Sequence, residues 1–287
     1  MDSILKNNII IPKRLVDAHK GTHGCVAIVG GADGMQGAVT LASRAALLAG
    51  AGRVYACFLS NEAPKLDSAY PEIMMRLPAS LGSLKQLDCV VIGPGLGLTD
   101  EAKSLLSFWL QKPVKLVIDA DALNLIASHQ ILRDLLVKRK DFSVFTPHLG
   151  EAARLLKVTT EEIQQHRIDY CLNLAEQYHV VCVLKGAGTL VAHQEQYAIN
   201  TTGNSGLASG GSGDVLSGVI GSLIAQGLSP FEASRTGVFI HGAAADALVA
   251  RGIGPRGLTA SEVALEARNI LNALALDAEL PNSSPDL

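Results

Sequence analysis

The sequence has few aromatic residues, little net charge and no long apolar run, and each shortage argues against a class of protein. Of the 287 residues, 4% are aromatic and the net charge is −3, which speaks against stacking on single-stranded nucleic acid and against attraction to its phosphates. No run reaches the about 18 apolar residues of a membrane-spanning helix, and the first residues lack the pattern of a signal peptide. We therefore expect a cytoplasmic protein that binds neither nucleic acid nor membrane.

Cysteine is scarce as well, and its spacing fits neither disulfides nor zinc. Five cysteines are present, an odd number, and no two of them form a Cys-x-x-Cys pair. Four lie in short apolar runs that are typical of buried strands: Cys25, Cys57, Cys89 and Cys182. We expect the thiols to behave as small buried apolar groups in a reducing compartment.

Hydrophobic residues are plentiful, at 48% of the chain, and short apolar runs alternate with longer helical segments. The pattern predicts strands at 25–29, 53–58, 73–77, 88–92, 115–118, 142–145, 180–184, 190–192 and 196–200, and helices at 13–18, 38–49, 99–110, 159–178, 214–226, 230–249 and 259–274. We expect an α/β fold in which helices cover both faces of a mostly parallel central sheet. With no repeat or linker, a single domain over 1–287 is the simplest organisation, with its core at about 13–274 and a frayed tail at 281–287.

The glycine-rich stretch from Gly203 to Ile220 is the most informative segment. It begins as a loop too rich in glycine to pack a core, and it continues as an apolar helix with one acidic residue, Asp214, in its first turn. Glycines let backbone N–H groups face a ligand, and a helix N-terminus adds unpaired donors and a partial positive charge. The stretch predicts an anion site, most often for phosphate, with Asp214 as the base for an attacking hydroxyl. The alternative is an ordinary glycine-rich turn in which Asp214 is a first-turn helix charge.

Loops after the predicted strands point to the same place. Five of them are candidates for ligand binding: 30–38, 93–97, 119–124, 146–151 and 185–189. Ligands of parallel sheets bind outside the carboxyl ends of the strands, so we expect the five loops to converge on the loop before Asp214.

Some residues of these loops allow more than one interpretation. Asp119, Asp121 and Asn124 suit a sugar hydroxyl, a cation or water, but the alternative is that Asp121 caps a helix and Asp119 is solvated. His148 is either part of a binding site or a loop histidine paired with the backbone. Lys185 stands with two glycines at a strand end and is able to meet a phosphate, although this pattern is weak by itself.

The chain from about Lys13 to Leu274 resembles the ADP-dependent NAD(P)H-hydrate dehydratases of the ribokinase-like superfamily. The resemblance rests on five motifs: GNSGLASGGSGD at 203–214, TPHLGE at 146–151, GPGLG at 93–97, IDADALN at 118–124 and KGAGT at 185–189. The first two are specific. Many ribokinase-like kinases have Gly-x-Gly-Asp, but the lead-in Gly-Asn-x-Gly-Leu-Ala resembles this family, and sugar and vitamin kinases usually have Asn-x-x-Glu where this chain has His-Leu-Gly-Glu. The resemblance implies a ribokinase-like three-layer sandwich. Because the match begins near Met1, we expect any partner epimerase of NAD(P)H-hydrate to be a separate chain.

The resemblance also implies a repair reaction. NADH or NADPH that has added water at the nicotinamide ring would be dehydrated back from the (S)-form of the hydrate, while ADP becomes AMP and phosphate. Phosphorylation makes the hydroxyl a good leaving group, with Asp214 as the base and the N–H groups of Gly211, Ser212 and Gly213 as an anion hole. Mg²⁺ would bridge phosphate oxygens, with Glu151 acting on it through water.

The family pattern implies further contacts, position by position. It places the hydrate near Ala38, Gly97, His148 and Asp214. It places the AMP portion on Lys185, Gly186, Ala187, Gly188, Thr189 and Gly213, with Asn204 as an additional contact. No role follows for Asp119, Asp121 or Asn124. A homo-oligomer, plausibly a tetramer, is expected for the family, and the alanine-rich helices at 230–249 and 259–274 offer a contact face, although their apolar positions fit the core equally well.

Two other functions remain open. A ribokinase-like kinase of a small vitamin-precursor alcohol would share Asp214 and the anion hole. A non-catalytic nucleotide-binding sensor would share the loops but would not need Asp214 as a base.

Overall fold

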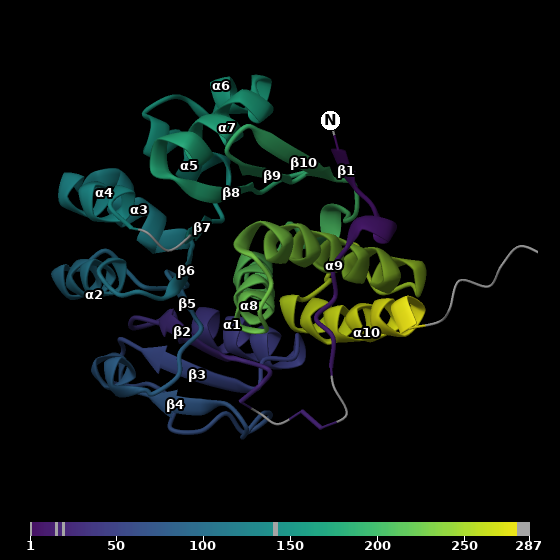
Figure 1. The fold of residues 1–287 in the computed structure, drawn as a ribbon, viewed down its shortest axis with the longest axis horizontal. Coiled ribbons are helices and arrows are strands. Elements are labelled where there is room, and N and C mark those ends of the chain that lie inside the picture. Colours follow the sequence, from purple (N-terminus) through teal and green to yellow (C-terminus); the bar gives the residue numbers. More distant parts are fainter. Residues whose placement is uncertain (1, 15–16, 19–20, 140–142, 280–287) are drawn as a thin grey trace, which may run out of the picture.

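A ten-stranded sheet forms the centre of the protein, in a computed structural model that describes residues 2–14, 17–18, 21–139 and 143–279 (Figure 1). The strands are β1 (Asp2–Ile4), β2 (Cys25–Gly30), β3 (Arg53–Phe58), β4 (Met74–Arg76), β5 (Cys89–Ile92), β6 (Lys115–Ile118), β7 (Ser143–Phe145), β8 (Val180–Leu184), β9 (Leu190–His193) and β10 (Gln196–Asn200). Their order across the sheet is β1-β10-β9-β8-β7-β6-β5-β2-β3-β4. Pairing is parallel from β8 to β4, whereas β9 runs antiparallel to both of its neighbours.

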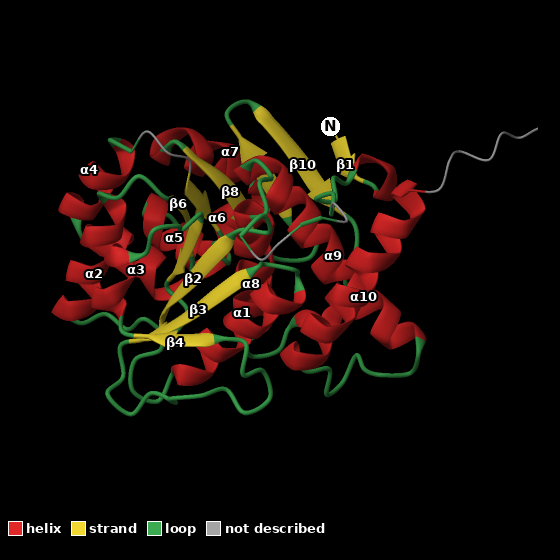
Figure 2. Cartoon of the chain, turned by 60° about the horizontal axis from the view of Figure 1, so that its bottom comes forward, coloured by secondary structure: helices red, strands yellow, loops and turns green. Residues whose placement is uncertain are grey.

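Helices cover both faces of this sheet and produce three layers (Figures 1 and 2). They are α1 (Gln36–Leu48), α2 (Asp100–Leu110), α3 (Ala120–Ser128), α4 (Gln130–Val137), α5 (Leu149–Leu156), α6 (Thr160–Gln165), α7 (Arg167–Tyr178), α8 (Ser212–Ala225), α9 (Pro230–Ala250) and α10 (Ala260–Glu279). Helices α1, α8, α9 and α10 share one core with Val26 and Ile28, and α2 to α7 share the other with Ala27 and Val29. Because successive strand residues point to opposite faces, β2 supplies both cores, and the predicted architecture is confirmed.

Two predictions about elements are wrong, and some helices were missed. The helix expected over 159–178 is divided into α6 and α7 at His166, whose φ of −130° and ψ of 46° are not helical. The described residues within 13–18 form no helix. Helices α3 and α5 were not given predicted bounds, and helix α4 was not predicted at all. The start of the strand predicted at 142–145 and the tail at 281–287 lie outside the described residues.

The carboxyl ends of the parallel strands form one edge of the sheet, and the N-terminus of α8 meets this edge. The loop after β2 donates from Ala32 N to Gly95 O in the loop after β5, at 2.7 Å. The loop after β8 begins with Lys185 N, which donates to Pro147 O in the loop after β7, at 2.8 Å. Within the described part of the chain, no helix is both long and apolar enough to cross a membrane.

Candidate active site

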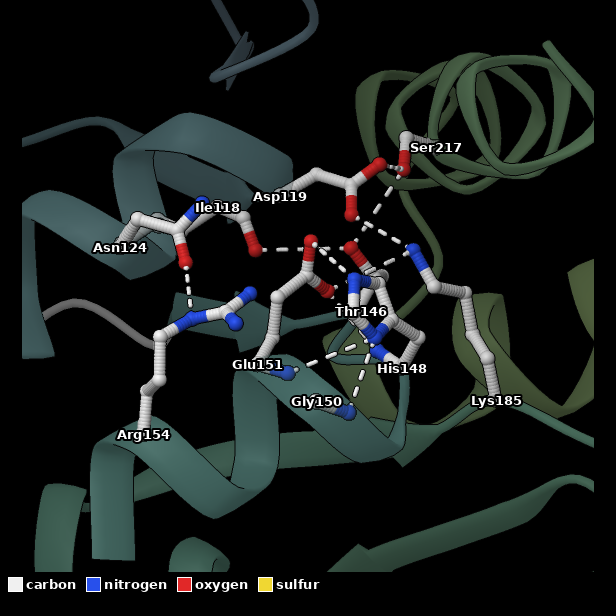
Figure 3. Close-up of polar contacts among 10 residues, drawn as sticks. All are labelled: Ile118, Asp119, Asn124, Thr146, His148, Gly150, Glu151, Arg154, Lys185 and Ser217. Atoms are coloured by element: carbon white, nitrogen blue, oxygen red, sulfur yellow. Dashed lines mark hydrogen bonds and ion pairs between the residues drawn. The ribbon is translucent and has the colours of Figure 1, made fainter. Parts of the chain in front are cut away.

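Residues from the loops after β6, β7 and β8 and from α8 come together around a buried ion pair (Figure 3). Lys185 Nζ donates to Asp119 Oδ1 at 2.8 Å, and Ser217 Oγ, from α8, donates to Asp119 Oδ2 at 2.6 Å. Asp119 is only 1% exposed, so both carboxylate oxygens are satisfied by protein donors. The pair ties the ends of β6 and β8 to α8.

This arrangement decides between the two interpretations of Asp119 and Asp121. Asp119 is buried, and it occupies the N-cap position of α3 without a capping hydrogen bond from its side chain. Asp121 lies in the first turn of α3, and its Oδ2 accepts a hydrogen bond from Gly97 N at 2.8 Å. The alternative with a solvated Asp119 and a capping Asp121 is therefore wrong. Asn124 accepts from Arg154 Nε at 2.8 Å through its side-chain oxygen, and so links α3 to α5.

The ammonium of Lys185 is a positive charge held among carboxylates. Burial alone would lower its pKa, but Asp119 and then Glu151 favour the charged form, and the pKa of Lys185 is raised above its usual value. Burial likewise works against ionised Asp119, but Lys185 and Ser217 outweigh it, and the pKa of Asp119 is lowered. A Cβ atom at position 213 would lie 3.3 Å from Lys185 Nζ. The Lys185 ammonium therefore lies beside the first turn of α8. A cation at this place would stabilise the negative charge of a phosphoryl group during its transfer.

The glycine-rich loop ends as predicted, at a helix N-terminus with Asp214 in the first turn. Gly211 precedes the helix with φ of 85°, a left-handed conformation that favours glycine. A Cβ atom there would also lie 2.4 Å from Leu41 Cδ1. Ser212 N, at the start of α8, donates to Ser209 O at 3.4 Å. The next N–H groups, those of Gly213 and Asp214, have no partners within the helix, and such groups suit an anion.

Asp214 is a largely buried carboxylate with other carboxylates around it. Burial first, and then the neighbouring Asp119, raise the pKa of Asp214 to about 7, while Lys185 opposes the shift. Asp121 and Glu151 add to it. A pKa near neutrality suits a general base, since the group then both loses and accepts a proton readily.

His148 and Glu151 form a reciprocal cap at the start of α5. His148 Nδ1 accepts from Gly150 N at 2.9 Å, and His148 N donates to Glu151 Oε2 at 2.8 Å. Because Nδ1 accepts, the ring proton belongs on Nε2, which lies 3.2 Å from Glu151 Oε1. The ring is therefore paired with the backbone, as one interpretation held, and with 53% of its side chain exposed it also faces solvent at the site.

Glu151 is the acidic residue of this cluster that was predicted to act on a metal ion, and His148 already engages both of its oxygens. It is 4% exposed and its Oε2 lies 4.0 Å from Lys185 Nζ. Among the described residues, no three His, Cys, Asp or Glu side chains are arranged to hold a metal ion. Mg²⁺ usually takes one or two carboxylates, waters and the phosphates of its nucleotide. The residues present fit a magnesium ion carried by a nucleotide, which Glu151 would reach through water, and the described residues do not fit a site made by protein alone.

The residues predicted to bind the two ligands lie mainly on different loops: those for the nucleotide follow β8, and those for the hydrate follow β2, β5 and β7. On the β8 side, Gly186, Ala187 and Gly188 are exposed. Arg167, the first residue of α7, holds this loop by donating to Leu184 O at 3.3 Å and to Ala187 O. On the β5 and β2 side, Ala38 lies beside Gly95, where an added Cβ atom would approach its Cβ to 3.3 Å, and Gly97 lies beside Ala32. Asn204 differs from the other predicted contacts, because its side chain is already bound to Asp246 and Gly206.

Sequence reasoning missed several side chains that build this site. They are Ser217, Arg167, His241 and Asp246, together with the role of Asp119 as the partner of Lys185. Two of them had a usable signal: His241 and Asp246 stand among alanines on α9, where a polar side chain is unexpected. Arg167 and Ser217 had none, since arginine and serine are common on helices.

Comparison with known proteins gives a consistent result. The model of a family described as NAD(P)H-hydrate dehydratase matches residues 26–265. An ADP-dependent (S)-NAD(P)H-hydrate dehydratase of Neisseria meningitidis is 41% identical over 271 residues, which cover 92% of this chain and 90% of that protein. A bifunctional NAD(P)H-hydrate repair enzyme of Coxiella burnetii is 44% identical over 268 residues, covering 92% of this chain but 53% of that protein. The chain thus spans about half the length of the bifunctional relatives that it matches.

Solved structures confirm the predicted fold. The ADP/ATP-dependent NAD(P)H-hydrate dehydratase of Bacillus subtilis, co-crystallised with ATP and Mg²⁺, is similar with a TM-score of 0.85 and 28% identity, over 95% of this chain and 98% of that one. A ribokinase-like superfamily protein of Enterococcus faecalis is similar with a TM-score of 0.81 and 28% identity, over 95% and 94% of the two chains. The three-layer sandwich is therefore ribokinase-like.

Proposed function

The chain belongs to the NAD(P)H-hydrate dehydratase family, and we propose that it catalyses the ADP-dependent dehydration of (S)-NAD(P)H-hydrate to NAD(P)H, with AMP and phosphate as products. The observation that carries the proposal is the first turn of α8. There a carboxylate with a pKa of about 7, Asp214, stands beside the Lys185 ammonium and beside backbone N–H groups that have no partner within the helix. A base next to an anion site is what phosphorylation of a hydroxyl requires.

The first half of the reaction is a phosphoryl transfer. Asp214 accepts the proton of the hydrate's hydroxyl, the oxygen attacks the β-phosphorus of ADP, and the bond between this phosphorus and the bridging oxygen breaks to release AMP. The N–H groups of Gly211, Ser212 and Gly213, with Lys185, stabilise the charge on the phosphoryl oxygens. Magnesium held beside Glu151 would supply further neutralisation of the phosphates.

The second half is an elimination. The electron pair of the ring nitrogen expels the new phosphate group, and the resulting cation loses a ring proton to give the reduced nicotinamide. The same anion hole accepts the departing phosphate, so one set of donors serves both halves.

The two ligands approach α8 from its two sides. We place the AMP portion on Lys185, Gly186, Ala187, Gly188, Thr189 and Gly213, and the hydrate near Ala38, Gly97, His148 and Asp214. The exposed backbone of the loop after β8 supports the first placement, and the open left-handed turn at Gly97, with φ of 75°, supports the second.

The wider setting is part of the same proposal. We propose a single cytoplasmic domain over 1–287 that uses Mg²⁺ with ADP and assembles as a homo-oligomer. An NAD(P)H-hydrate epimerase in the same pathway would convert the other form of the hydrate into the (S)-form that this site takes.

Recovery of reduced nicotinamide absorbance tests the proposal directly. We expect the purified protein to restore absorbance from NADH-hydrate when ADP and Mg²⁺ are added. Asp214→Asn should lower turnover by at least about 10²-fold, the usual scale for a lost general base, while the affinity for ADP changes only a few-fold. Asp169→Asn is the matched control, because this carboxylate is 80% exposed on α7, outside the site.

Two outcomes would contradict the proposal. Absence of ADP-dependent recovery, together with ATP-dependent phosphorylation of a small vitamin-precursor alcohol, would assign the site to a kinase. Full turnover in Asp214→Asn would remove Asp214 as the base, and unchanged biological output in that variant without any turnover would favour a nucleotide sensor.

A further inference from the structure

A carboxylate outside the predicted site holds the beginning of the glycine-rich loop. Asp246, on α9, accepts from Gly203 N through Oδ2 at 2.8 Å and from Asn204 Nδ2 through Oδ1 at 2.9 Å. Asn204 Oδ1 in turn accepts from Gly206 N at 2.9 Å. These three hydrogen bonds form one chain of donors and acceptors, and they fix the path of the first four residues of the loop.

The same helix holds the residues on either side of this chain. Thr202 Oγ1 donates to Phe239 O at 3.0 Å just before the loop, and the loop lies so close to α9 that a Cβ atom at Gly242 would approach Thr202 Oγ1 to 2.3 Å. At the far end of the loop, Ser212 Oγ lies 3.2 Å from His241 Nε2 in a buried contact. Side-chain contacts thus hold both ends of the loop against α9. The loop leads directly into the first turn of α8.

Both polar atoms of the Asn204 side chain form hydrogen bonds within the protein. Its amide nitrogen donates to Asp246 and its oxygen accepts from Gly206. A nucleotide contact by this side chain would compete with bonds that shape the loop. The burial of Gly206, whose added Cβ atom would lie 3.1 Å from Pro255 O, leaves little room for an alternative path.

We propose that Asp246 and Asn204 are a pair of positioning residues for the anion hole. They do not touch the substrates; they set the path of 203–211 and through it the direction of the N–H groups at the start of α8. This inference rests on the proposed function, because it gives the aligned N–H groups the task of stabilising the transferred phosphoryl group. The cost of misaligning such donors falls on the transition state, so it should appear in kcat more than in the affinity for ADP.

An exchange of the two side chains tests the pair. In Asp246→Asn an amide N–H would face the amide N–H of Asn204, and in Asn204→Asp a carboxylate would face the carboxylate of Asp246. The double variant N204D/D246N restores every hydrogen bond with one of them reversed: Asn at 246 accepts from Gly203 N and donates to Asp at 204, which accepts from Gly206 N. Its net charge equals that of the original protein.

We expect each single variant to lower kcat at least tenfold with the ADP dissociation constant changed less than threefold. The double variant should return kcat to within threefold of the original. Asn204→Ser is a milder variant, since the hydroxyl keeps an acceptor for Gly206 N and loses only the donor to Asp246, and it should fall between the original and Asn204→Asp. If a single exchange variant does not fold, Asn204→Ser still tests the loss of the hydrogen bond to Asp246. Asp169→Asn again serves as the control.

Hydrogen–deuterium exchange of the peptide over 203–212 separates this inference from the proposed function. Faster exchange in both single variants and recovery in the double variant would support the pairing even if the protein proved not to repair NADH-hydrate. Unchanged kcat in single variants with faster exchange would overturn the positioning role. A double variant with recovered exchange but weakened ADP binding and no recovery of kcat would overturn it in favour of a direct contact between Asn204 and the nucleotide.

Discussion

The fold destabilises the ionised form of Asp214, as its proposed role as a general base requires. Its burial and its neighbours Asp119, Asp121 and Glu151 all disfavour the ionised carboxylate, and Lys185 compensates only in part. In the unfolded chain the same side chain would titrate near its ordinary value of 3.8. The folded protein therefore holds a proton on Asp214 over a range of pH in which the unfolded chain has lost it.

The consequence for stability has a definite sign. Between pH 3.8 and about 7 the folded state binds more protons than the unfolded state, so the contribution of Asp214 to the free energy of unfolding falls as pH rises. Asp214→Asn removes the penalty, and we expect the variant to be more stable than the original by roughly 1–3 kcal/mol at pH 8, after allowance for partial solvent screening. At pH 4 the two should differ little. Urea unfolding at both pH values measures this.

Glu176→Gln is the control for that measurement, because Glu176 is exposed on α7. Its removal should change stability by less than about 0.5 kcal/mol at either pH. A loss of stability in Asp214→Asn at pH 8 would show that the ionised carboxylate makes favourable contacts and would contradict the raised pKa.

For individual residues, the sequence predicted the place of a side chain in its element better than it predicted contacts between side chains. Asp214 could be placed in a first helical turn because the glycines, the acid and the apolar run follow one another in the chain. The pairing of Lys185 with Asp119 could not be predicted, since it joins residues 66 positions apart and depends on which strands are neighbours. The engagement of Asn204 by Asp246 was missed for the same reason.

Helix α8 has to lie unusually close to its neighbours in order to reach the edge of the sheet. A Cβ atom at Gly218 would approach Ala42 O on α1 to 2.1 Å, and one at Gly221 would approach Val91 Cγ2 on β5 to 2.4 Å. Glycine weakens a helix by about 0.5–1 kcal/mol relative to alanine, so its presence at these positions reflects packing. The close approach carries Ser217 to Asp119 and so connects the packing of α8 to the site.

Gly218→Ala tests this close contact. The added methyl group must displace the backbone of α1, and we expect a loss of roughly 1–3 kcal/mol in the free energy of unfolding, the usual cost of overpacking. Gly37→Ala is the matched control on α1, because nothing lies within 4 Å of the added Cβ atom. It should raise stability by about 0.5–1 kcal/mol. Equal effects of the two substitutions in chemical denaturation would contradict the packing argument.

The bounds of helices and strands were predicted well where the signals that set them are local in the sequence. Strands β3 and β6 and helix α2 have the predicted bounds or nearly so, because apolar runs and the Thr99 cap are local signals. The division at His166 was missed because the helical pattern continues through it, and only the backbone conformation of that residue separates α6 from α7.

The whole molecule is organised by one sheet with two cores. The alternation of apolar strands with helices along the chain predicted that both faces would be covered. Strand order could not be predicted, nor the parallel pairing of β1 with β10, since register between distant segments has no local signal. Because both cores share the same strands, neither half of the molecule keeps its sheet if the other unfolds.

We therefore expect a single unfolding transition, as the proposed single domain requires. Leu223 on α8 and Leu106 on α2 are both fully buried, one in each core. Leu→Ala at either position should cost roughly 2–5 kcal/mol and lower the midpoint of the one transition by on the order of 5–10 °C. Thermal melts followed by far-ultraviolet and near-ultraviolet circular dichroism should coincide in both variants. Two transitions, with each substitution shifting only one of them, would show that the two layers of helices unfold independently and would divide the chain into two cooperative units.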